Sequence, residues 1–321
     1  MVLSVIIVSY NEKEYLSQAI ESCLNQTFQD FEIIIGDDGS TDGSYELIQK
    51  YESTYLGKIK CFQMNRCGGG IIPSIRVSNI VKHGLSMARG DYFILLSGDD
   101  YFSDRNSFEK QVTCLQKTQN QSISGCVTGF RKFWNDGEEQ IFEAIKYPAS
   151  LYWSGAYVHI SCVMFRREVF DKGLLLENFC DDTGLEFSTL LNGKWTYVQN
   201  IAFSYRQRDK SIMSSADEME LSLLELLLYQ DCMARKGMFF STMSRFARPL
   251  KTVFRNRTRI NEKRYNEYVQ LASNHPDSIV MQISSYDSFS KAKKLKLQAI
   301  LLFSQLLTFF FRIVRKVYRM I

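Results

Sequence analysis

Short apolar runs alternate with segments of helical periodicity along the first hundred residues of the chain. Leu3 to Val8 has the apolar character of a buried strand, and Tyr15, Leu16, Ala19, Ile20 and Cys23 follow it at helical spacing. The pattern predicts strands at 3–8, 31–35, 59–64 and 92–96, with helices at 15–24, 45–51 and 77–87 between them. Strands that alternate with helices form right-handed crossovers, so the fold class is α/β with a mostly parallel sheet flanked by helices.

The second half of the chain is less regular. Its pattern predicts helices at 108–115 and 183–191, and strands at 124–133, 162–165, 195–198 and 202–205. From about residue 215 the spacing is helical throughout, beginning with a leucine-rich helix at 219–233. We therefore expect a domain of residues 1–214 and a helical C-terminal region of residues 215–321.

Composition narrows the class of protein. The chain has 321 residues, enough for one sizeable core and a smaller appendage, and its net charge of +4 is too weak to indicate a nucleic-acid partner. Its 8 cysteines are scattered, without the spacing of a metal site. Because the N-terminus also lacks the features of a secretory signal, we expect reduced thiols and a cytoplasmic location.

The last thirty residues have a composition of their own. Lysines at 291, 293, 294 and 296 precede an uncharged stretch, 297–311, and basic residues follow at 312, 315, 316 and 319. The stretch is shorter than the roughly 20 residues that span a bilayer. It suits a helix that lies on the anionic inner face of the cell membrane, as in a peripherally associated protein. The alternative is a helix that docks on residues 221–228 or on a second copy of the chain, which would make a homo-oligomer.

Two acidic pairs follow predicted strands. Asp37 and Asp38 come after the second strand, and Asp99 and Asp100 come after the fourth. Parallel strands of an open sheet bind ligands at their carboxyl ends, so both pairs are expected at one edge. Mg²⁺ typically uses one or two carboxylates and completes its shell with phosphate oxygens. The alternatives are turn and cap chemistry for the first pair and a solvated acidic turn for the second.

The order of these motifs resembles the inverting, nucleotide-sugar-dependent glycosyltransferases of family 2, which have the GT-A fold. The resemblance covers roughly the first 210 residues. The matching segments are Ser4-Val5-Ile6-Ile7-Val8-Ser9-Tyr10-Asn11, residues 23–35, Asp37-Asp38-Gly39-Ser40-Thr41-Asp42-Gly43, Ala88-Arg89-Gly90-Asp91-Tyr92 and Asp99-Asp100.

The resemblance implies roles for residues of the donor site. Tyr10 would stack on the nucleobase and Asp38, with Asp37 beside it, would contact the base. Asp99 would be the last acid of the family's Asp-x-Asp motif, supported by Asp100, and would hold Mg²⁺ or Mn²⁺. Ser97 stands where that motif usually has its first aspartate, so metal binding would depend mainly on Asp99 and the diphosphate.

Further residues are assigned by the same resemblance. Asn65 could reach the nucleotide, and Arg206 and Arg208 would balance the charge of the departing diphosphate, with Arg208 at a position that is often histidine in the family. Asp182, in a Cys180-Asp181-Asp182 segment, would be the catalytic base. The alternative for Asp182, and more so for Asp181, is a cap on the helix that begins near residue 183.

These assignments predict an inverting hexosyltransferase-type enzyme. It would move a sugar from a nucleotide diphosphate sugar, with UDP as the expected nucleotide, to a hydroxyl of a glycan or lipid-linked oligosaccharide in surface polysaccharide synthesis. The alternative is a catalytically silent nucleotide-sugar-binding or scaffold protein of a polysaccharide assembly complex, which is favoured if Ser97 abolishes metal binding.

Overall fold

The computed structural model describes residues 1–65, 73–118, 122–144, 158–171 and 182–208, together with isolated stretches between 226 and 313. The chain forms two compact units, one of residues 1–146 and 158–211 and the other of residues 147–157 and 212–321. In the second unit the described residues are helical, and most of the helices predicted there lie outside the described residues. No helix in the described part is both long and apolar enough to cross a membrane.

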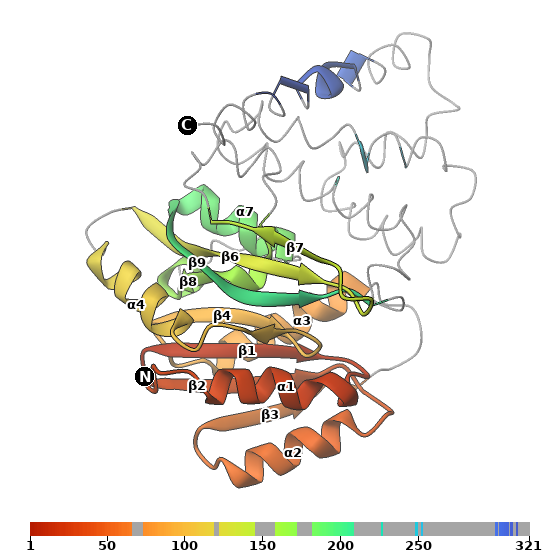
Figure 1. The fold of residues 1–321 in the computed structure, drawn as a ribbon, viewed down its shortest axis with the longest axis vertical. Helices are drawn as coiled ribbons and strands as arrows, with labels where there is room; N and C mark the ends of the chain where they lie inside the picture. The colour runs from red at the N-terminus through yellow and green to blue at the C-terminus, as the bar shows by residue number, and fades with distance from the viewer. Residues whose placement is uncertain are drawn as a thin grey trace. The chain divides into compact units, whose positions relative to one another are not determined.

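The first unit contains one mixed sheet with helices packed on it (Figure 1). Its strands are β1 (Leu3–Ser9), β2 (Phe31–Asp37), β3 (Ile59–Gln63), β4 (Tyr92–Ser97), β5 (Tyr101–Phe102), β6 (Ile123–Phe133), β7 (Glu139–Phe142), β8 (Val163–Arg166) and β9 (Lys194–Arg206). Its helices are α1 (Lys13–Leu24), α2 (Ser44–Thr54), α3 (Pro73–Met87), α4 (Ser107–Lys117), α6 (Glu168–Asp171) and α7 (Asp182–Asn192), with a 3₁₀ turn η1 (Ile160–Cys162). The strand order is β3-β2-β1-β4-β8-β6-β9-β5, and β7 pairs with β6.

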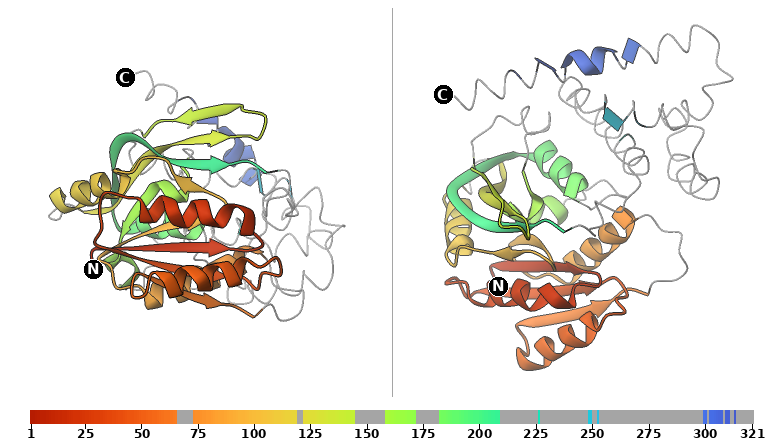
Figure 2. Two further views of the ribbon diagram at one scale, coloured as in Figure 1. Left: turned by 60° about the horizontal axis from the view of Figure 1, so that its bottom comes forward. Right: turned by 45° about the vertical axis from the view of Figure 1, so that its right-hand side comes forward.

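The first half of the sheet is parallel, as predicted. β1 lies between β2 and β4, and β3 pairs with β2. All of β2 and nearly all of β1 and β4 are buried, because helices cover both faces of this half: α1 and α2 lie on one face and α3 on the other (Figure 2). The switch of face follows from the handedness of crossovers, since the chain moves outward from β1 to β3 and then returns to place β4 on the opposite side of β1.

The second half of the sheet corrects part of the sequence prediction. The pairs β4–β8, β6–β8, β6–β7 and β5–β9 are antiparallel, and only β6–β9 is parallel. The two closing strands predicted at 195–198 and 202–205 are one long strand, β9, whose register against β6 shifts at irregularities. A bulged strand loses its regular alternation, which explains why the sequence pattern reads as two strands.

A buried carboxylate links the central strands of the parallel half. Glu32 of β2 accepts hydrogen bonds from the Ser4 hydroxyl at 2.9 Å and from the Arg89 backbone N–H at 2.7 Å, and the Arg89 guanidinium lies 2.8 Å away. Burial by itself would raise the pKa of Glu32, but these contacts outweigh it and lower the pKa. The charged form of Glu32 therefore stabilises the junction of β1, β2 and the turn before β4.

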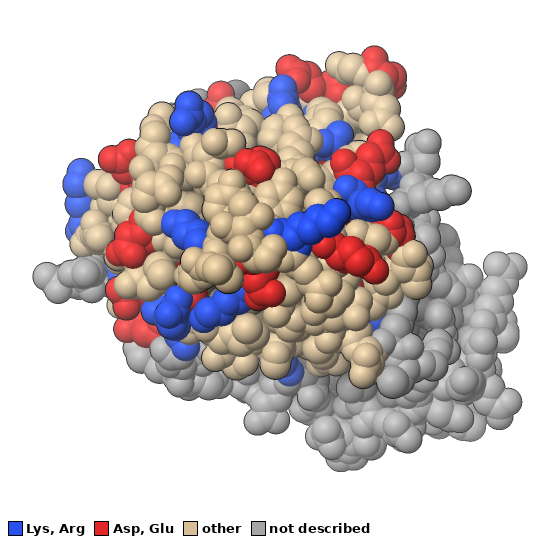
Figure 3. Space-filling view, turned by 90° about the horizontal axis from the view of Figure 1, so that it is seen from below, with Lys and Arg blue, Asp and Glu red and all other residues tan. Residues whose placement is uncertain are grey.

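The surface charge matches the modest net charge of the chain. On the face in Figure 3, acidic and basic side chains are interspersed, without an extended patch of one sign among the described residues.

Candidate functional site

The carboxyl ends of β2, β1 and β4 lie level with one another. In the register of the sheet Ser9 pairs with Asp37, and Val8 pairs with Ser97. Two hydrogen bonds continue this pairing beyond the strands, from the Asp38 N–H to the Ser9 carbonyl and from the Gly98 N–H to the Val8 carbonyl, both at 2.9 Å. The chain reverses its direction of progress across the sheet at this point, which is where open α/β sheets bind ligands.

The loop after β1 is bonded to the loop after β2. Asn11 has a φ of 53°, in the left-handed region that asparagine tolerates better than most residues. Its N–H donates to the Ser40 hydroxyl at 2.9 Å, and its side-chain oxygen accepts from the Thr41 N–H at 2.8 Å. The neighbouring Tyr10 is half-buried at this edge. The predicted base-stacking residue therefore precedes a residue that is hydrogen-bonded twice to the loop after β2.

Asp37 is fully buried and closes the turn after β2. Its carboxylate accepts from the N–H groups of Gly39 and Ser40 at 3.0 and 2.9 Å, from the Ser40 hydroxyl at 2.5 Å and from Gln63 at 2.9 Å. Four donors of the same chain thus occupy its oxygens, which favours the turn interpretation for this residue. Its predicted contact with a nucleotide stays a prediction.

Asp38 has a partner that the sequence analysis missed. The Arg76 guanidinium of α3 donates two hydrogen bonds to the Asp38 carboxylate, from Nε to Oδ2 at 2.7 Å and from Nη2 to Oδ1 at 2.6 Å. The two side chains are only 10% and 12% exposed. A two-pronged, largely desolvated contact of this kind is among the stronger ion pairs. A base that hydrogen-bonds to Asp38 would therefore have to share this carboxylate with Arg76.

A second guanidinium binds the acids after β4. Arg208 Nη2 lies 2.5 Å from Asp99 Oδ2 and 3.1 Å from Glu12 Oε1, and the three side chains are 17%, 10% and 7% exposed. Arg208 also lies over the Tyr15 ring, 5.3 Å from its centre. The structure thus brings the predicted metal-binding Asp99 and the predicted diphosphate-binding Arg208 into direct contact.

Arg206 is held by the same loop. Its backbone N–H donates to Asp100 Oδ1 at 2.8 Å, and its Nε donates to the Asp99 carbonyl at 3.0 Å. The guanidinium lies over the rings of Tyr15 and Phe133, at 4.6 and 4.9 Å from their centres. Cation–π contacts of this kind help to fix a guanidinium in place, so Arg206 joins the end of β9 to the loop after β4.

Glu12 is the acidic residue of this edge that sequence reasoning missed. Its Oε2 is buried without a hydrogen-bond partner, and so is Asp100 Oδ2. Burial, and then the charge of Asp99, raise the pKa of both carboxyl groups well above the usual value. A Cβ on Gly98 would lie 2.5 Å from Glu12 Oε2, so glycine at this position makes room for the carboxylate. The sequence signal that could have identified Glu12 is its position as a charged residue in the short loop between β1 and α1.

We tested whether these side chains suit a divalent cation. Among the described residues, no three His, Cys, Asp or Glu side chains are arranged as a metal site. The oxygens at this edge are nevertheless the hard donors that Mg²⁺ and Mn²⁺ prefer, and Asp100 Oδ2 has no partner. Asp99 together with the oxygens of a diphosphate therefore fits a cation that keeps few protein ligands.

Two further predicted residues are placed only in part. Asn65 is exposed and follows β3, at the same edge of the sheet as Asp38. Asp182 is the first residue of α7, which confirms the predicted helix with an earlier start. The side chain of Asp182 and all of Asp181 lie outside the described residues, so the position of the predicted base relative to Asp99 stays a prediction.

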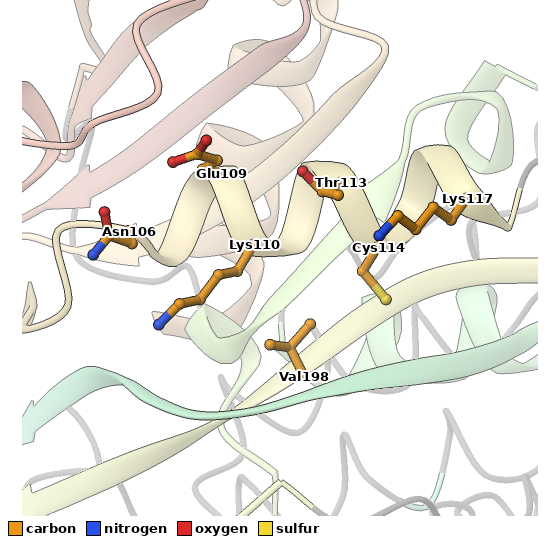
Figure 4. A pocket seen from close by; sticks show the side chains of 7 residues that line it. All are labelled: Asn106, Glu109, Lys110, Thr113, Cys114, Lys117 and Val198. Atoms are coloured by element: carbon orange, nitrogen blue, oxygen red, sulfur yellow. The ribbon is translucent and has the colours of Figure 1, made fainter.

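A separate hollow of about 530 Å³ lies between α4 and β9 (Figure 4). Its lining residues are Asn106, Glu109, Lys110, Thr113, Cys114, Lys117 and Val198. A hydrogen bond from Cys126 lowers the pKa of the Cys114 thiol to about 6. None of the residues predicted to bind the donor lines this hollow, and its one carboxylate has no second acid beside it in that lining. The edge formed by β2, β1 and β4 remains the better candidate site.

Solved structures with this fold include S. aureus TarS and a mannosyltransferase. S. aureus TarS 1-349, in complex with UDP-GlcNAc, superimposes with a TM-score of 0.62 at 16% identity over 100% of this chain and 92% of that one. The mannosyltransferase PcManGT from Pyrobaculum calidifontis, in complex with GDP-Man and Mn²⁺, gives a TM-score of 0.50 at 11% identity over 96% and 86%. At these identities the likeness establishes the fold, which is GT-A.

Two relatives of known sequence match parts of the chain. EpsE of Bacillus subtilis (strain 168) is 35% identical over 38% of this chain and 41% of its own length, so the match spans less than half of that protein. The cholesterol galactosyltransferase of Borreliella burgdorferi is 28% identical over 74% of this chain and 69% of its own. The model of glycosyl transferase family 2 matches residues 4–174, which is more than half of the chain. The chain therefore belongs to glycosyl transferase family 2.

Proposed function

We propose that this protein is an inverting glycosyltransferase that uses a nucleotide diphosphate sugar, with UDP as the nucleotide. The observation that carries the proposal is the level placement of Tyr10, Asp38 and Asp99 at the ends of three adjacent strands. Adjacent strands lie about 4.8 Å apart, so the row extends roughly 10 Å across the sheet. Family membership supports the proposal, as do the UDP-GlcNAc bound by TarS and the GDP-Man and Mn²⁺ bound by PcManGT.

The proposed chemistry assigns a task to each part of the edge. Tyr10 stacks on the base, and Asp99 holds the diphosphate end through Mg²⁺ or Mn²⁺, with Asp100 behind it. A bound cation supplies Lewis-acid stabilisation of the leaving diphosphate. Asp182 takes the proton of the acceptor hydroxyl as that oxygen bonds to the anomeric carbon and the bond to the diphosphate breaks. Arg206 and Arg208 supply positive charge beside the leaving group.

A silent nucleotide-sugar-binding scaffold is the second candidate. The contact between Arg208 and Asp99 favours it, because a guanidinium on that carboxylate competes with a metal ion. Ser97, in place of the family's usual first aspartate, points the same way.

Calorimetry with UDP and a hydrolysis screen of nucleotide sugars will separate the two candidates. We expect UDP to bind more tightly with Mn²⁺ than with EDTA, and at least one sugar donor to be hydrolysed. Binding without turnover of any donor would support the scaffold. If UDP does not bind in either buffer, both candidates fail.

For the acceptor, we propose a glycan or lipid-linked oligosaccharide of surface polysaccharide synthesis, reached from the inner face of the cell membrane. The described apolar side chains Leu302, Leu306 and Phe309 are 62%, 68% and 63% exposed, and basic residues flank their segment. We expect the full chain to sediment with vesicles that contain phosphatidylglycerol, and a chain without residues 297–321 to remain in the supernatant. Equal sedimentation of both proteins would exclude this role for the segment.

A further inference from the structure

Arg208 occupies the carboxylate that the proposed function assigns to a divalent cation. Its Nη2 is 2.5 Å from Asp99 Oδ2, and the same nitrogen is 3.1 Å from Glu12 Oε1. The Asp99 side chain is only 10% exposed, so the carboxylate that Arg208 binds has little contact with solvent. A divalent cation at Asp99 would meet this guanidinium at close range, and like charges in a poorly solvated place repel strongly.

The cluster has carboxyl oxygens that Arg208 does not contact. Glu12 Oε2 and Asp100 Oδ2 are buried and have no hydrogen-bond partner. The guanidinium of Arg206, the other cation nearby, donates from Nη2 to Gln18 Oε1 at 2.6 Å and from Nε to the Asp99 carbonyl. Without Arg208, Asp99 would therefore lie among unpartnered carboxyl oxygens, which are hard donors that a divalent cation prefers.

A diphosphate offers Arg208 a better partner. Phosphate oxygens match the fork of a guanidinium and bind it with two hydrogen bonds, whereas Arg208 now uses a single Nη2 for both carboxylates. Its Nε is buried and has no partner, so the present arrangement leaves one of its donors unused.

We propose that Arg208 is a built-in competitor of the metal: it covers Asp99 in the donor-free protein and transfers to the diphosphate when a donor binds. This inference rests on the proposed function, because it needs a diphosphate at this edge. It makes the donor and the cation bind cooperatively, and the coupling is reciprocal by thermodynamic necessity. A cell rich in free Mg²⁺ would then not load the site before the sugar donor arrives.

Titration of the full-length protein with MnCl₂ tests the inference, with free Mn²⁺ measured by electron paramagnetic resonance. In the absence of nucleotide we expect Arg208→Gln to bind Mn²⁺ about tenfold or more tightly than the wild type, within the usual range of coupling. The gain should disappear in the double variant Arg208→Gln with Asp99→Asn. Lys110→Gln is the matched control, since it removes one positive charge that pairs with Asp104 at 2.7 Å, and it should leave Mn²⁺ affinity unchanged.

The outcomes separate this inference from the proposed function. Unchanged Mn²⁺ affinity in Arg208→Gln, with UDP still bound by the wild type, overturns the competitor role alone. A gain that survives the Asp99→Asn change also overturns it, because the extra ion would be bound elsewhere. Failure of the wild type to bind UDP overturns both. If Arg208→Gln does not fold, Arg208→Met removes the charge but keeps a long side chain, and an unchanged Mn²⁺ affinity in that variant counts against the inference.

Discussion

Asp99→Asn will lower donor turnover by about a thousandfold while the protein stays folded. The proposed cation stabilises the leaving diphosphate by several kcal/mol, and each 1.36 kcal/mol changes a rate about tenfold. Asparagine keeps the shape of the side chain but removes the negative charge. The measurement is steady-state hydrolysis or transfer with the donor identified by the screen, at saturating Mn²⁺.

The matched control for this change is Asp104→Asn. Asp104 lies five residues further on and forms an ion pair with Lys110 at 2.7 Å, so the variant makes the same chemical change outside the donor site. We expect it to retain turnover within about twofold, as surface ion pairs contribute little. Thermal unfolding of both variants will exclude a loss of structure. If Asp99→Asn keeps wild-type turnover, the cation role of Asp99 is wrong.

Asp182→Asn will lower turnover by about 10²–10⁴-fold, the usual contribution of a general base. UDP affinity should stay at the wild-type value, since the base contacts the acceptor and not the nucleotide. Asparagine has nearly the same shape as aspartate, so we expect α7 to begin at this residue in the variant as well, with only the base removed.

Asp181→Asn is the natural comparison for the base, because the two acids are adjacent and either fits the motif. If Asp182 is the base, Asp181→Asn keeps most of the activity. The reverse result moves the assignment to Asp181. If both variants turn over the donor normally, neither acid is the base and the inverting mechanism needs another carboxylate.

The parallel half of the fold could be read from the sequence because its strands are buried on both faces. β1 and β2 contain the apolar runs 5–8 and 33–35, and the helix between them keeps one apolar side. The strands β5 and β7 have two and four residues, too few for a period to be visible. β5 and β7 form because they hydrogen-bond to β9 and β6, respectively. Such pairing depends on the assembled sheet and not on the local sequence.

The acids of the candidate site were predictable, but their partners were not. Strand ends mark Asp38 and Asp99, whereas Arg76 lies 38 residues from Asp38 and Glu12 lies 196 residues from Arg208. No local pattern encodes such distances. The pairing of Tyr101 with Ser204 in β5 and β9 explains why Arg206 reaches Asp100, and that pairing could not be foreseen without β5.

The two hydrogen bonds of Asn11 have a consequence for evolution as well as for binding. Because Ser40 and Thr41 hold that residue from the neighbouring loop, the segments that carry Tyr10 and Asp38 form one rigid frame before any nucleotide arrives. A frame that is already ordered reduces the conformational entropy lost on binding. New sugar specificities can then arise by substitutions in other loops, while the residues proposed to bind the nucleotide stay unchanged.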